Sequence, residues 1–405
     1  MVEELELFLK SHDAGRYTRD HFDKYCKKEK LCLSIPTIHI AGSNGKGSTA
    51  RFLEAIYLAQ GYKVGAFIKP SFVCVNESIR LNGEEIDDQT LARLYKDESK
   101  AIAKYDLSAF EATVGIAYRY FEEKRPDIVI IEAGMGGGVD ATNIDEMDTI
   151  LSIITSISLE HTAYLGTTVS QIAYSKSGII KEEKPILIGQ LEDEAKNIVR
   201  EYAEDMDAPF YEVDSFHFDQ VLPDGYHFDY RPFKDLSVST FSRYQLKNAS
   251  IAIEATKILA ETFPVSEEAV RKGLRCTLLP GRFEQVGNLI FDGAHNPEAT
   301  KELVASLNRV RGGKRVHVLF ASMRDKNIAV MLPELNRDFD HIILTTFDHP
   351  RARKEEDYFL YLGDYEFLSD PKKALEDLIH QFPDDLILIT GSLAFVGFLR
   401  RFYVK

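Results

Sequence analysis

Short apolar runs rich in β-branched residues alternate with longer amphipathic stretches along almost the whole chain. Such runs predict buried parallel strands, and the amphipathic stretches predict the helices that connect them. The clearest predicted strands cover residues 37–40, 63–67, 127–131 and 149–154 in the first part, and 288–291, 315–319, 341–344 and 385–389 in the last part. The pattern therefore predicts an α/β fold.

Two interruptions of this pattern suggest how the chain is divided. Residues 211–242 are rich in Asp, Phe, Tyr and Pro, which predicts antiparallel strands or a long excursion before a helix that begins near Gln245. A turn at Pro280-Gly281 follows a helical segment, and a new strand–helix series starts beyond it. With 405 residues, the chain also exceeds what one core usually organises. We predict a first domain over residues 1–279, a linker over 280–286 and a smaller, Rossmann-like α/β domain over 287–405.

Composition narrows the classes of partner. The formal net charge of -15 argues against a general nucleic-acid binder or a binder of anionic membranes. The four cysteines have no CxxC spacing, so neither a zinc site nor a disulfide scaffold is predicted. The first ten residues place acids among leucines, and no apolar stretch is long enough to span a bilayer. We expect a cytoplasmic protein with no nucleic-acid and no membrane partner.

A glycine-rich stretch lies between the predicted strand 37–40 and a predicted helix over 50–60. Its residues are Gly42, Ser43, Asn44, Gly45, Lys46, Gly47, Ser48 and Thr49. A strand, such a turn and a helix N-terminus offer backbone N–H groups and one lysine to a polyphosphate. We expect Lys46 to neutralise the β and γ phosphates, and Ser48 or else Thr49 to hold Mg²⁺. The first domain is therefore predicted to be a P-loop ATPase domain with a mostly parallel sheet.

This loop departs from the general Walker A pattern in two places. Ile40 stands where the first glycine belongs, and Gly47 stands where Ser or Thr should follow the lysine. The alternative interpretation is a glycine-rich turn without a ligand. Such turns rarely also place a lysine and a serine at the start of a helix, so we favour nucleotide binding.

Glu132 follows the predicted strand 127–131 and opens a second glycine-rich turn, residues 132–143. In an open parallel sheet, ligands bind outside the carboxyl ends of the strands, so Glu132 is expected near the phosphate loop. Mg²⁺ prefers carboxylate and hydroxyl oxygens together with substrate phosphates. Glu132 is thus a predicted metal ligand, the alternative being an acidic loop residue that binds no metal.

The phosphate loop, with Asn44 two residues before the lysine, resembles that of the Mur-type ligases and specifically of the folylpolyglutamate synthase/dihydrofolate synthase family. The turn 132–143 resembles the family's Glu-x-Gly-x-Gly-Gly-Arg-x-Asp-Ala-Thr-Asn signature, except that Gly138 occupies the arginine position. The resemblance extends over nearly the whole chain. It implies an ATP-dependent amide ligase that uses ATP and Mg²⁺ and belongs to folate metabolism.

The resemblance also implies roles for residues whose types alone would not reveal them. The segment 158–166 is similar to the family's Asp-His-x-x-x-Leu-Gly, in which the histidine, here His161, binds a second Mg²⁺; Glu160 replaces the aspartate. The segment 172–180 is similar to the family's Lys-x-Gly-Ile, which implies that Lys176 is carbamylated and catalytic. A lone histidine is otherwise more often structural than a ligand.

On the substrate side, residues 67–83 look like the family's Thr-Ser-Pro-His-Leu loop followed by Asn-Glu-Arg-Ile-Arg-x-Asn-Gly. Phe72 is the substrate contact predicted there. Lys69 sits where a metal-binding serine is expected and Ser71 where histidine is usual, so the resemblance is weakest here. Glu111, in a helix that the family places near the folate, is a second predicted substrate contact; the alternative is an ordinary amphipathic helix.

Four further residues match the family's nucleotide and cleft contacts. Asn248 lies in the adenosine-side helix of the resemblance, and Arg282 follows Pro280-Gly281, where the family's arginine reaches the phosphates. Asp292 and His295 belong to an Asp-Gly-Ala-His-Asn-Pro motif, which implies a nucleotide contact and a catalytic group.

The implied reaction transfers a phosphoryl group from ATP to a substrate carboxylate, and the amine of L-glutamate then attacks the acyl phosphate. Folate or dihydropteroate is the implied acceptor, and a monomer is implied. Two alternatives remain: a Mur-type ligase for another carboxylic acid, motivated by Lys69, Ser71 and Gly138, and a nucleotide-binding protein without ligase activity.

Overall fold

The computed structural model describes residues 8, 19–69, 71, 72 and 74–404. Positions 70 and 73 of the predicted substrate loop, and the first ten residues apart from Phe8, lie outside this range. The chain forms two compact units. The first contains residues up to 218, with 228–237 and 247–277, and the second contains 219–227, 238–246 and 278–405. The domain boundaries at 279 and 287 stay predictions.

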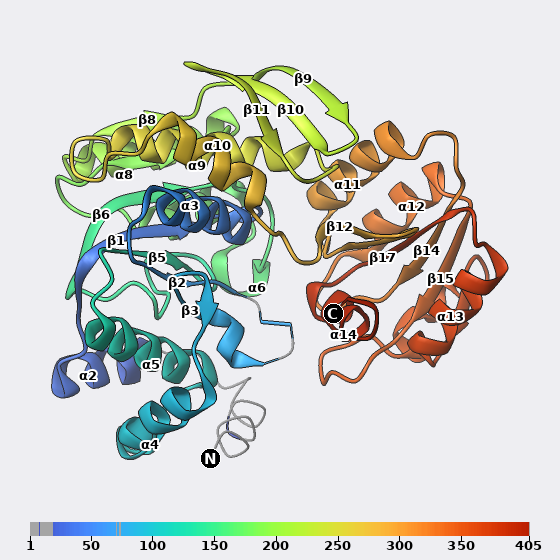
Figure 1. Ribbon diagram of the computed structural model, residues 1–405. Coiled ribbons are helices and arrows are strands. Elements are labelled where there is room, and N and C mark those ends of the chain that lie inside the picture. The colour runs from blue at the N-terminus through green and yellow to red at the C-terminus, as the bar shows by residue number, and fades with distance from the viewer. Residues whose placement is uncertain (1–7, 9–18, 70, 73, 405) are drawn as a thin grey trace. The chain divides into compact units, whose positions relative to one another are not determined.

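The first unit is built on an eight-stranded sheet (Figure 1). In spatial order its strands are β4 (Glu84–Glu85), β3 (Ile79–Leu81), β2 (Val64–Phe67), β5 (Ile128–Glu132), β1 (Leu33–Ala41), β6 (Met147–Ile154), β7 (Ile186–Ile188) and β8 (Phe210–Glu212). From β2 to β8 all neighbours run parallel, and β3 and β4 add an antiparallel edge. The four strands predicted in this part are confirmed.

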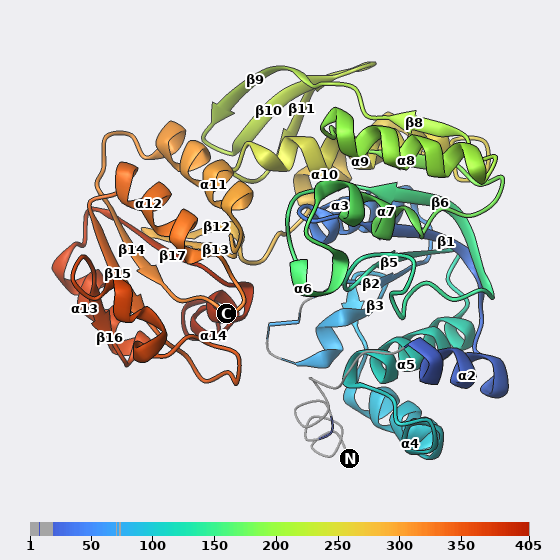
Figure 2. The ribbon, with the colours of Figure 1, turned by 180° about the vertical axis from the view of Figure 1, so that it is seen from behind.

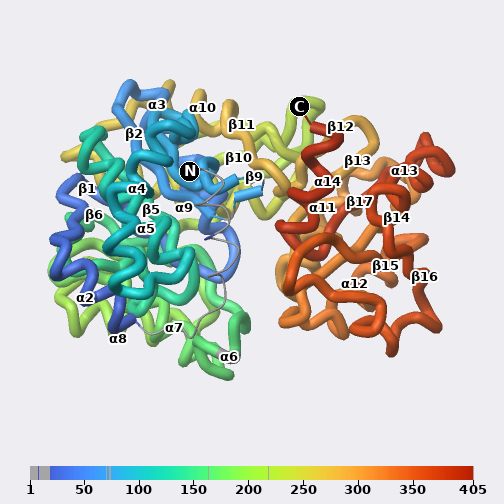
Figure 3. Tube along the Cα trace, turned by 90° about the horizontal axis from the view of Figure 1, so that it is seen from below, coloured from blue at the N-terminus to red at the C-terminus, as the bar shows by residue number. Residues whose placement is uncertain are grey.

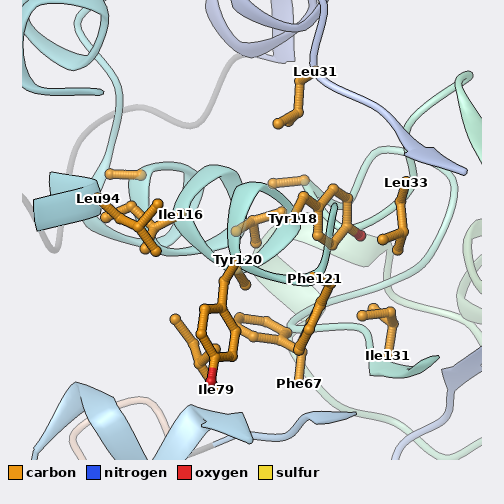
Figure 4. Close-up of a cluster of buried hydrophobic side chains, with 14 of the residues drawn as sticks. Leu31, Leu33, Phe67, Ile79, Leu94, Ile116, Tyr118, Tyr120, Phe121 and Ile131 are labelled. Atoms are coloured by element: carbon orange, nitrogen blue, oxygen red, sulfur yellow. The ribbon is translucent and has the colours of Figure 1, made fainter. Parts of the chain in front are cut away.

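Helix α5 (Ala109–Lys124) covers one face of this sheet together with α2 (Arg19–Glu29) and α4 (Asp88–Lys104), and α4 lies beside α5 (Figure 3). Figure 4 shows how its Tyr118 and Phe121 meet strand residues such as Phe67 and Ile131. The buried positions of α5 recur along most of its length, which fits a helix pressed between a sheet and other helices. Helix α3 (Lys46–Gln60) packs against α10 (Glu267–Cys276) and also contacts β5 and β2.

Three further helices of the first unit matter for the site. They are α6 (Thr162–Leu165), α7 (Val169–Ser177) and α8 (Asp193–Asp205). Helices α7 and α8 lie side by side (Figure 2), and side chains of α8 share a core with β6 and β7. Helix α9 (Tyr244–Ile258) begins one residue before the helix start predicted near Gln245.

The segment with the shifted composition forms a small sheet in the order β11-β10-β9. Its strands are β9 (His217–Leu222), β10 (Gly225–Tyr230) and β11 (Phe233–Val238). Each connection has two residues, which requires antiparallel neighbours. The first of the two predicted options, antiparallel strands, is confirmed.

The second unit contains a six-stranded sheet. In spatial order its strands are β12 (Arg282–Val286), β13 (Leu289–Asp292), β17 (Leu386–Thr390), β14 (Val316–Phe320), β15 (His341–Thr345) and β16 (Glu366–Leu368). Only the pair of β12 and β13 among these is antiparallel. Helices α11 (Pro297–Val310) and α12 (Ile328–Asp338) pack on one face, and α13 (Pro371–Gln381) and α14 (Leu393–Tyr403) on the other. The predicted α/β class, with a second Rossmann-like layer structure, is confirmed.

Within the described ranges, no helix combines the length and the apolar character needed to cross a membrane.

Candidate active site

The phosphate loop joins β1 to α3, and Thr155 and Ser156, which directly follow β6, hold it in place. Gly42 has φ 150, and a β-carbon there would lie 2.0 Å from the Thr155 hydroxyl oxygen. The Ser43 N–H donates to the Ser156 carbonyl at 2.8 Å, and the Thr155 hydroxyl donates to the Asn44 carbonyl at 2.6 Å. The loop therefore keeps its shape through contacts with a segment more than 100 residues away.

Gly45 is the N-cap of α3 and adopts a left-handed conformation with φ 87. A β-carbon at this position would lie 2.3 Å from the Asn248 amide oxygen. The side chain of Asn248, which is 7% exposed, thus lies in contact with the phosphate loop. The first N–H groups of α3 have no partner inside the helix and carry its positive dipole end, which suits an oxyanion.

The Lys46 ammonium folds back over this loop and donates to the carbonyls of Gly42 at 2.6 Å and Ser43 at 3.3 Å. Ser48 and Thr49 occupy the first turn of α3 and are buried. The Thr49 hydroxyl has no hydrogen-bond partner in the described part of the chain. Ser48 remains the predicted hydroxyl ligand.

Glu132 ends β5 and pairs in register with Ile40 of β1, so its carboxylate lies at the same sheet edge as the phosphate loop. Its Oε2 accepts a hydrogen bond from the backbone N–H of Lys69 at 2.9 Å. A β-carbon on Gly47 would lie 3.0 Å from the same oxygen. The glycine that breaks the Walker pattern is therefore the residue that lets this carboxylate approach the loop.

A carboxylate and a hydroxyl beside a phosphate loop fit Mg²⁺, which is usually bound by one or two carboxylates together with substrate phosphates. Among the described residues, no group of three or more His, Cys, Asp or Glu side chains forms a metal cage.

Lys176 is buried in α7 and donates to Glu160 Oε1 at 2.8 Å, the two side chains being 1% and 5% exposed. Burial raises the pKa of Glu160, but Lys176, followed by Lys46 and His161, outweighs burial and holds that pKa below its usual range. Burial lowers the pKa of Lys176, and Glu160 opposes this. Glu160 is longer than the family's aspartate by one methylene, and it is this longer side chain that makes the ion pair with Lys176.

His161 follows directly and caps α6 in a left-handed conformation with φ 47. Its Nε2 lies 3.8 Å from Glu160 Oε2. A non-glycine residue with this backbone is uncommon and often occurs at functional sites.

The two predicted substrate residues have defined local contacts. The backbone N–H of Phe72 donates to Glu77, and Glu111 accepts hydrogen bonds from the Ser108 N–H at 2.8 Å and the Ser108 hydroxyl at 2.7 Å. Ser108 and Glu111 form a capping box that starts α5. Glu111 therefore has a structural role, and its contact with substrate stays a prediction.

In the second unit, Asp292 is 2% exposed at the end of β13. Its carboxylate accepts hydrogen bonds from the Tyr244 hydroxyl at 2.6 Å, the Phe283 N–H at 2.8 Å and the Ala294 N–H at 2.9 Å. Burial raises its pKa, and Tyr244 and Arg282 are the main opposing influences. Asp292 therefore holds together the start of β12 and the turn after β13.

Arg282 opens β12 opposite Asp292, and His295 lies in the turn after β13. His295 Nδ1 lies 2.9 Å from the Gly293 carbonyl oxygen. Since a carbonyl only accepts, Nδ1 carries the proton in this bond, which leaves Nε2 to accept when the ring is neutral.

Comparison with known proteins places this geometry in a family. Residues 40–256 match the model of the Mur ligase middle domain, and residues 281–393 match the Mur ligase, glutamate ligase domain. The dihydrofolate synthase/folylpolyglutamate synthase of Bacillus subtilis is 32% identical over 389 residues, which cover 91% of this chain and 90% of the relative. The chain belongs to the folylpolyglutamate synthase/dihydrofolate synthase family of Mur ligases.

Solved structures match this family member over 98% or more of its length. Mycobacterium tuberculosis folylpolyglutamate synthase, complexed with ADP and AMPPCP, has a TM-score of 0.90 at 25% identity and covers 100% of this chain and 98% of its own. A bifunctional folylpolyglutamate synthase/dihydrofolate synthase with Mn, AMPPNP and L-glutamate bound has a TM-score of 0.86 at 28% identity, covering 98% and 97%.

Several contacts of this family member had no signal in the sequence pattern. The brace from Thr155 and Ser156 to the phosphate loop and the Tyr244 hydroxyl on Asp292 join segments far apart in the chain. The ion pair of Glu160 with Lys176 likewise joins two segments of the chain that no pattern connects.

Proposed function

We propose that this chain is an ATP-dependent ligase that joins L-glutamate to the carboxyl group of a folate through an acyl-phosphate intermediate. The observation that carries the proposal is the carboxylate of Glu132, which lies against the phosphate loop at Gly47. In the proposed complex, the phosphates of ATP and the groups that neutralise their charge would lie at this one edge of the sheet. The named relatives act as folylpolyglutamate and dihydrofolate synthases.

In the proposed reaction, the loop from Gly42 to Thr49 holds the β and γ phosphates of ATP with its N–H groups. Lys46 exchanges its loop carbonyls for phosphate oxygens and stabilises the charge of the transferring group. Ser48 and Glu132 would hold Mg²⁺, and His161 a second ion. The metal, when bound, neutralises phosphate charge.

Lys176 acts from its place beside Glu160, either as the ammonium of the ion pair or as the carbamate that the family resemblance implies. A ¹³C NMR spectrum recorded in labelled bicarbonate distinguishes the two forms, because only the carbamate adds a protein-bound carbon. Asn248 is proposed to contact the nucleotide from beside Gly45.

The remaining proposed contacts come from the other residues of the family motifs. Arg282 and Asp292 are proposed for nucleotide binding, His295 as a catalytic group, and Phe72 and Glu111 for the folate.

The test is an ADP-release assay with tetrahydrofolate and dihydropteroate run side by side, each with and without L-glutamate. Product formation that requires glutamate with either acceptor supports the proposal, and a longer folate should appear by mass spectrometry. Turnover with dihydropteroate adds the dihydrofolate synthase activity that the Bacillus subtilis relative's name includes. A matched Lys46→Met variant should release no ADP.

Two experimental results would favour a different function. Turnover with other carboxylic acids but no pteroyl acceptor would favour a different Mur-type ligase, the reading motivated by Lys69, Ser71 and Gly138. ATP binding without acceptor-dependent ADP release, even in bicarbonate, would favour a non-catalytic nucleotide-binding protein. The cytoplasmic location and the monomeric state stay predictions, and light scattering after size-exclusion chromatography tests the second.

A further inference from the structure

The turn between Glu132 and β6, which we call the glycine loop (residues 133–143), is held by Arg19, which precedes its contacts in the loop by 119 to 124 residues. Arg19 opens α2, and its Nη1 donates to the carbonyls of Gly138 at 2.7 Å and Asp140 at 3.0 Å. Its Nη2 donates to the carbonyl of Asn143. One guanidinium thus gathers three carbonyls from the far half of the loop. It meets the carbonyl of the residue that stands where the family signature has an arginine.

Three glycines in the near half of the glycine loop lie close to three helices. A β-carbon on Gly134 would lie 2.5 Å from Phe110 of α5, and one on Gly136 would lie 2.9 Å from Leu165 of α6. A β-carbon on Gly137 would lie 2.6 Å from the carbonyl oxygen of Lys176 in α7. Gly137 is therefore required by close packing against backbone, whereas a side chain at Gly134 or Gly136 would have to displace the side chain of Phe110 or Leu165.

The loop is also bonded to the end of α7. The Gly138 N–H donates to the Ser175 carbonyl at 3.0 Å, and the Asn143 amide donates to the Gly178 carbonyl at 2.9 Å. A β-carbon on Gly178 would lie 2.4 Å from the Gly138 α-carbon. Residues on both sides of Lys176 are thus fixed to the same loop whose other end is Glu132.

We propose that Arg19 is a positioning residue of the ligase reaction: its guanidinium holds the glycine loop against α7 and so fixes the places of Glu132 and Lys176. The inference rests on the proposed function, because it concerns the placing of groups that this function uses. Arg19 itself touches neither the phosphate loop nor Lys176 by any hydrogen bond found in the described residues.

The chemistry of the contact explains why arginine is needed. A guanidinium presents donors in a planar fork, and here Nη1 and Nη2 serve the loop while Nε serves Asp23 at 2.8 Å. Lysine would keep the charge, but its donors all radiate from one atom. The side chain of Arg19 is 18% exposed, so a small guanidinium ion from solution has access to the same place.

The experiment compares Arg19→Ala and Arg19→Lys with wild type and with Asp23→Asn, which removes the ion pair but leaves the loop contacts. We expect kcat of Arg19→Ala to fall by about 10- to 100-fold, since small displacements of catalytic groups cost that much. The KM for ATP should change less than kcat does, because the braces of the phosphate loop are untouched. Added guanidinium chloride at non-denaturing concentration should restore part of kcat.

Hydrogen exchange provides a readout that does not depend on turnover. In Arg19→Ala, amides of residues 134–143 should exchange faster, while those of residues 42–49 keep their wild-type rates. The Lys variant should lose kcat as well, and Asp23→Asn should match wild type.

A wild-type kcat in Arg19→Ala overturns the inference. So does a lost kcat that guanidinium cannot restore in a protein whose loop exchanges as in wild type. If Arg19→Ala does not fold, the Lys variant decides, and a wild-type kcat there refutes the need for the fork. These outcomes are separate from a failure of the proposed function, in which wild type itself forms no glutamate-dependent folate product.

Discussion

Burial of His39 predicts how the stability of the first unit depends on pH. His39 lies in β1 with 0% exposure, and its Nε2 is 2.9 Å from the Thr142 hydroxyl oxygen. That hydroxyl donates its only proton to Asp140 Oδ1 at 2.6 Å, so the histidine nitrogen must be the donor. Nδ1 is buried and has no hydrogen-bond partner among the described residues. A second ring proton would therefore be unsatisfied.

Burial, with smaller contributions from Lys181 and Arg19, lowers the pKa of His39 to about 3. The unfolded chain keeps a histidine pKa of roughly 6.5. Between these values the unfolded state binds a proton and the folded state does not, so stability falls as pH drops below 6.5. With roughly 1.4 kcal/mol per pKa unit, the loss attributable to His39 at pH 5 is about 2 kcal/mol.

The assay is urea unfolding at pH 7, 6 and 5, followed by circular dichroism, of wild type and His39→Gln. The curves should be fitted with two transitions because the chain has two units. Glutamine keeps an N–H donor for Thr142 but does not titrate in this range. The variant is expected to lose about 2 kcal/mol less than wild type between pH 7 and 5. Equal losses in both proteins would refute the assignment.

Two further experiments test the site, each with a matched control variant. Lys176→Met leaves the Glu160 carboxylate buried without its ion-pair partner and should lower the free energy of unfolding by about 3–5 kcal/mol. Adding Glu160→Gln to this variant should recover most of that loss. A loss below about 1 kcal/mol in Lys176→Met would contradict the buried pair. Gly45→Ala adds left-handed strain and a collision with Asn248, and should raise the Kd for ADP in calorimetry at least ~10-fold. The matched Gly61→Ala has the strain with open space around it and should leave that Kd unchanged; equal effects would sink the argument.

The predicted strands were found because buried parallel strands leave continuous apolar runs that need no knowledge of their partners. Helix α3 was harder to delimit, since it begins at Lys46, four residues before the predicted start at Ala50. Its first turn contains Gly47 and Ser48, which are weak helix formers, and a glycine in left-handed conformation fixes its beginning.

The site was predictable where its chemistry is local. The phosphate loop and Glu132 each follow a strand that the pattern reveals, and parallel strands bring their carboxyl ends to one edge. Contacts such as that of Arg19 with the glycine loop join residues 119 or more apart, and no periodicity records such a pair. Glu111 shows the opposite case. It was predicted from the family motif as a substrate contact, and the structure shows it in a capping box with Ser108, three residues earlier.

The contact between Gly138 and Gly178 is not symmetrical, and this sets how each position tolerates change. A β-carbon on Gly138 would stand 3.2 Å from the other α-carbon, a distance that a shift of a few tenths of an ångström relieves. The converse substitution would bring the atoms to 2.4 Å and force two backbones apart. In a library of single substitutions that is selected for activity, variants at position 138 should become rarer as the side chain grows. At position 178 even the alanine variant should be absent. Any descendant of this chain that acquires the family's arginine would therefore keep the second glycine.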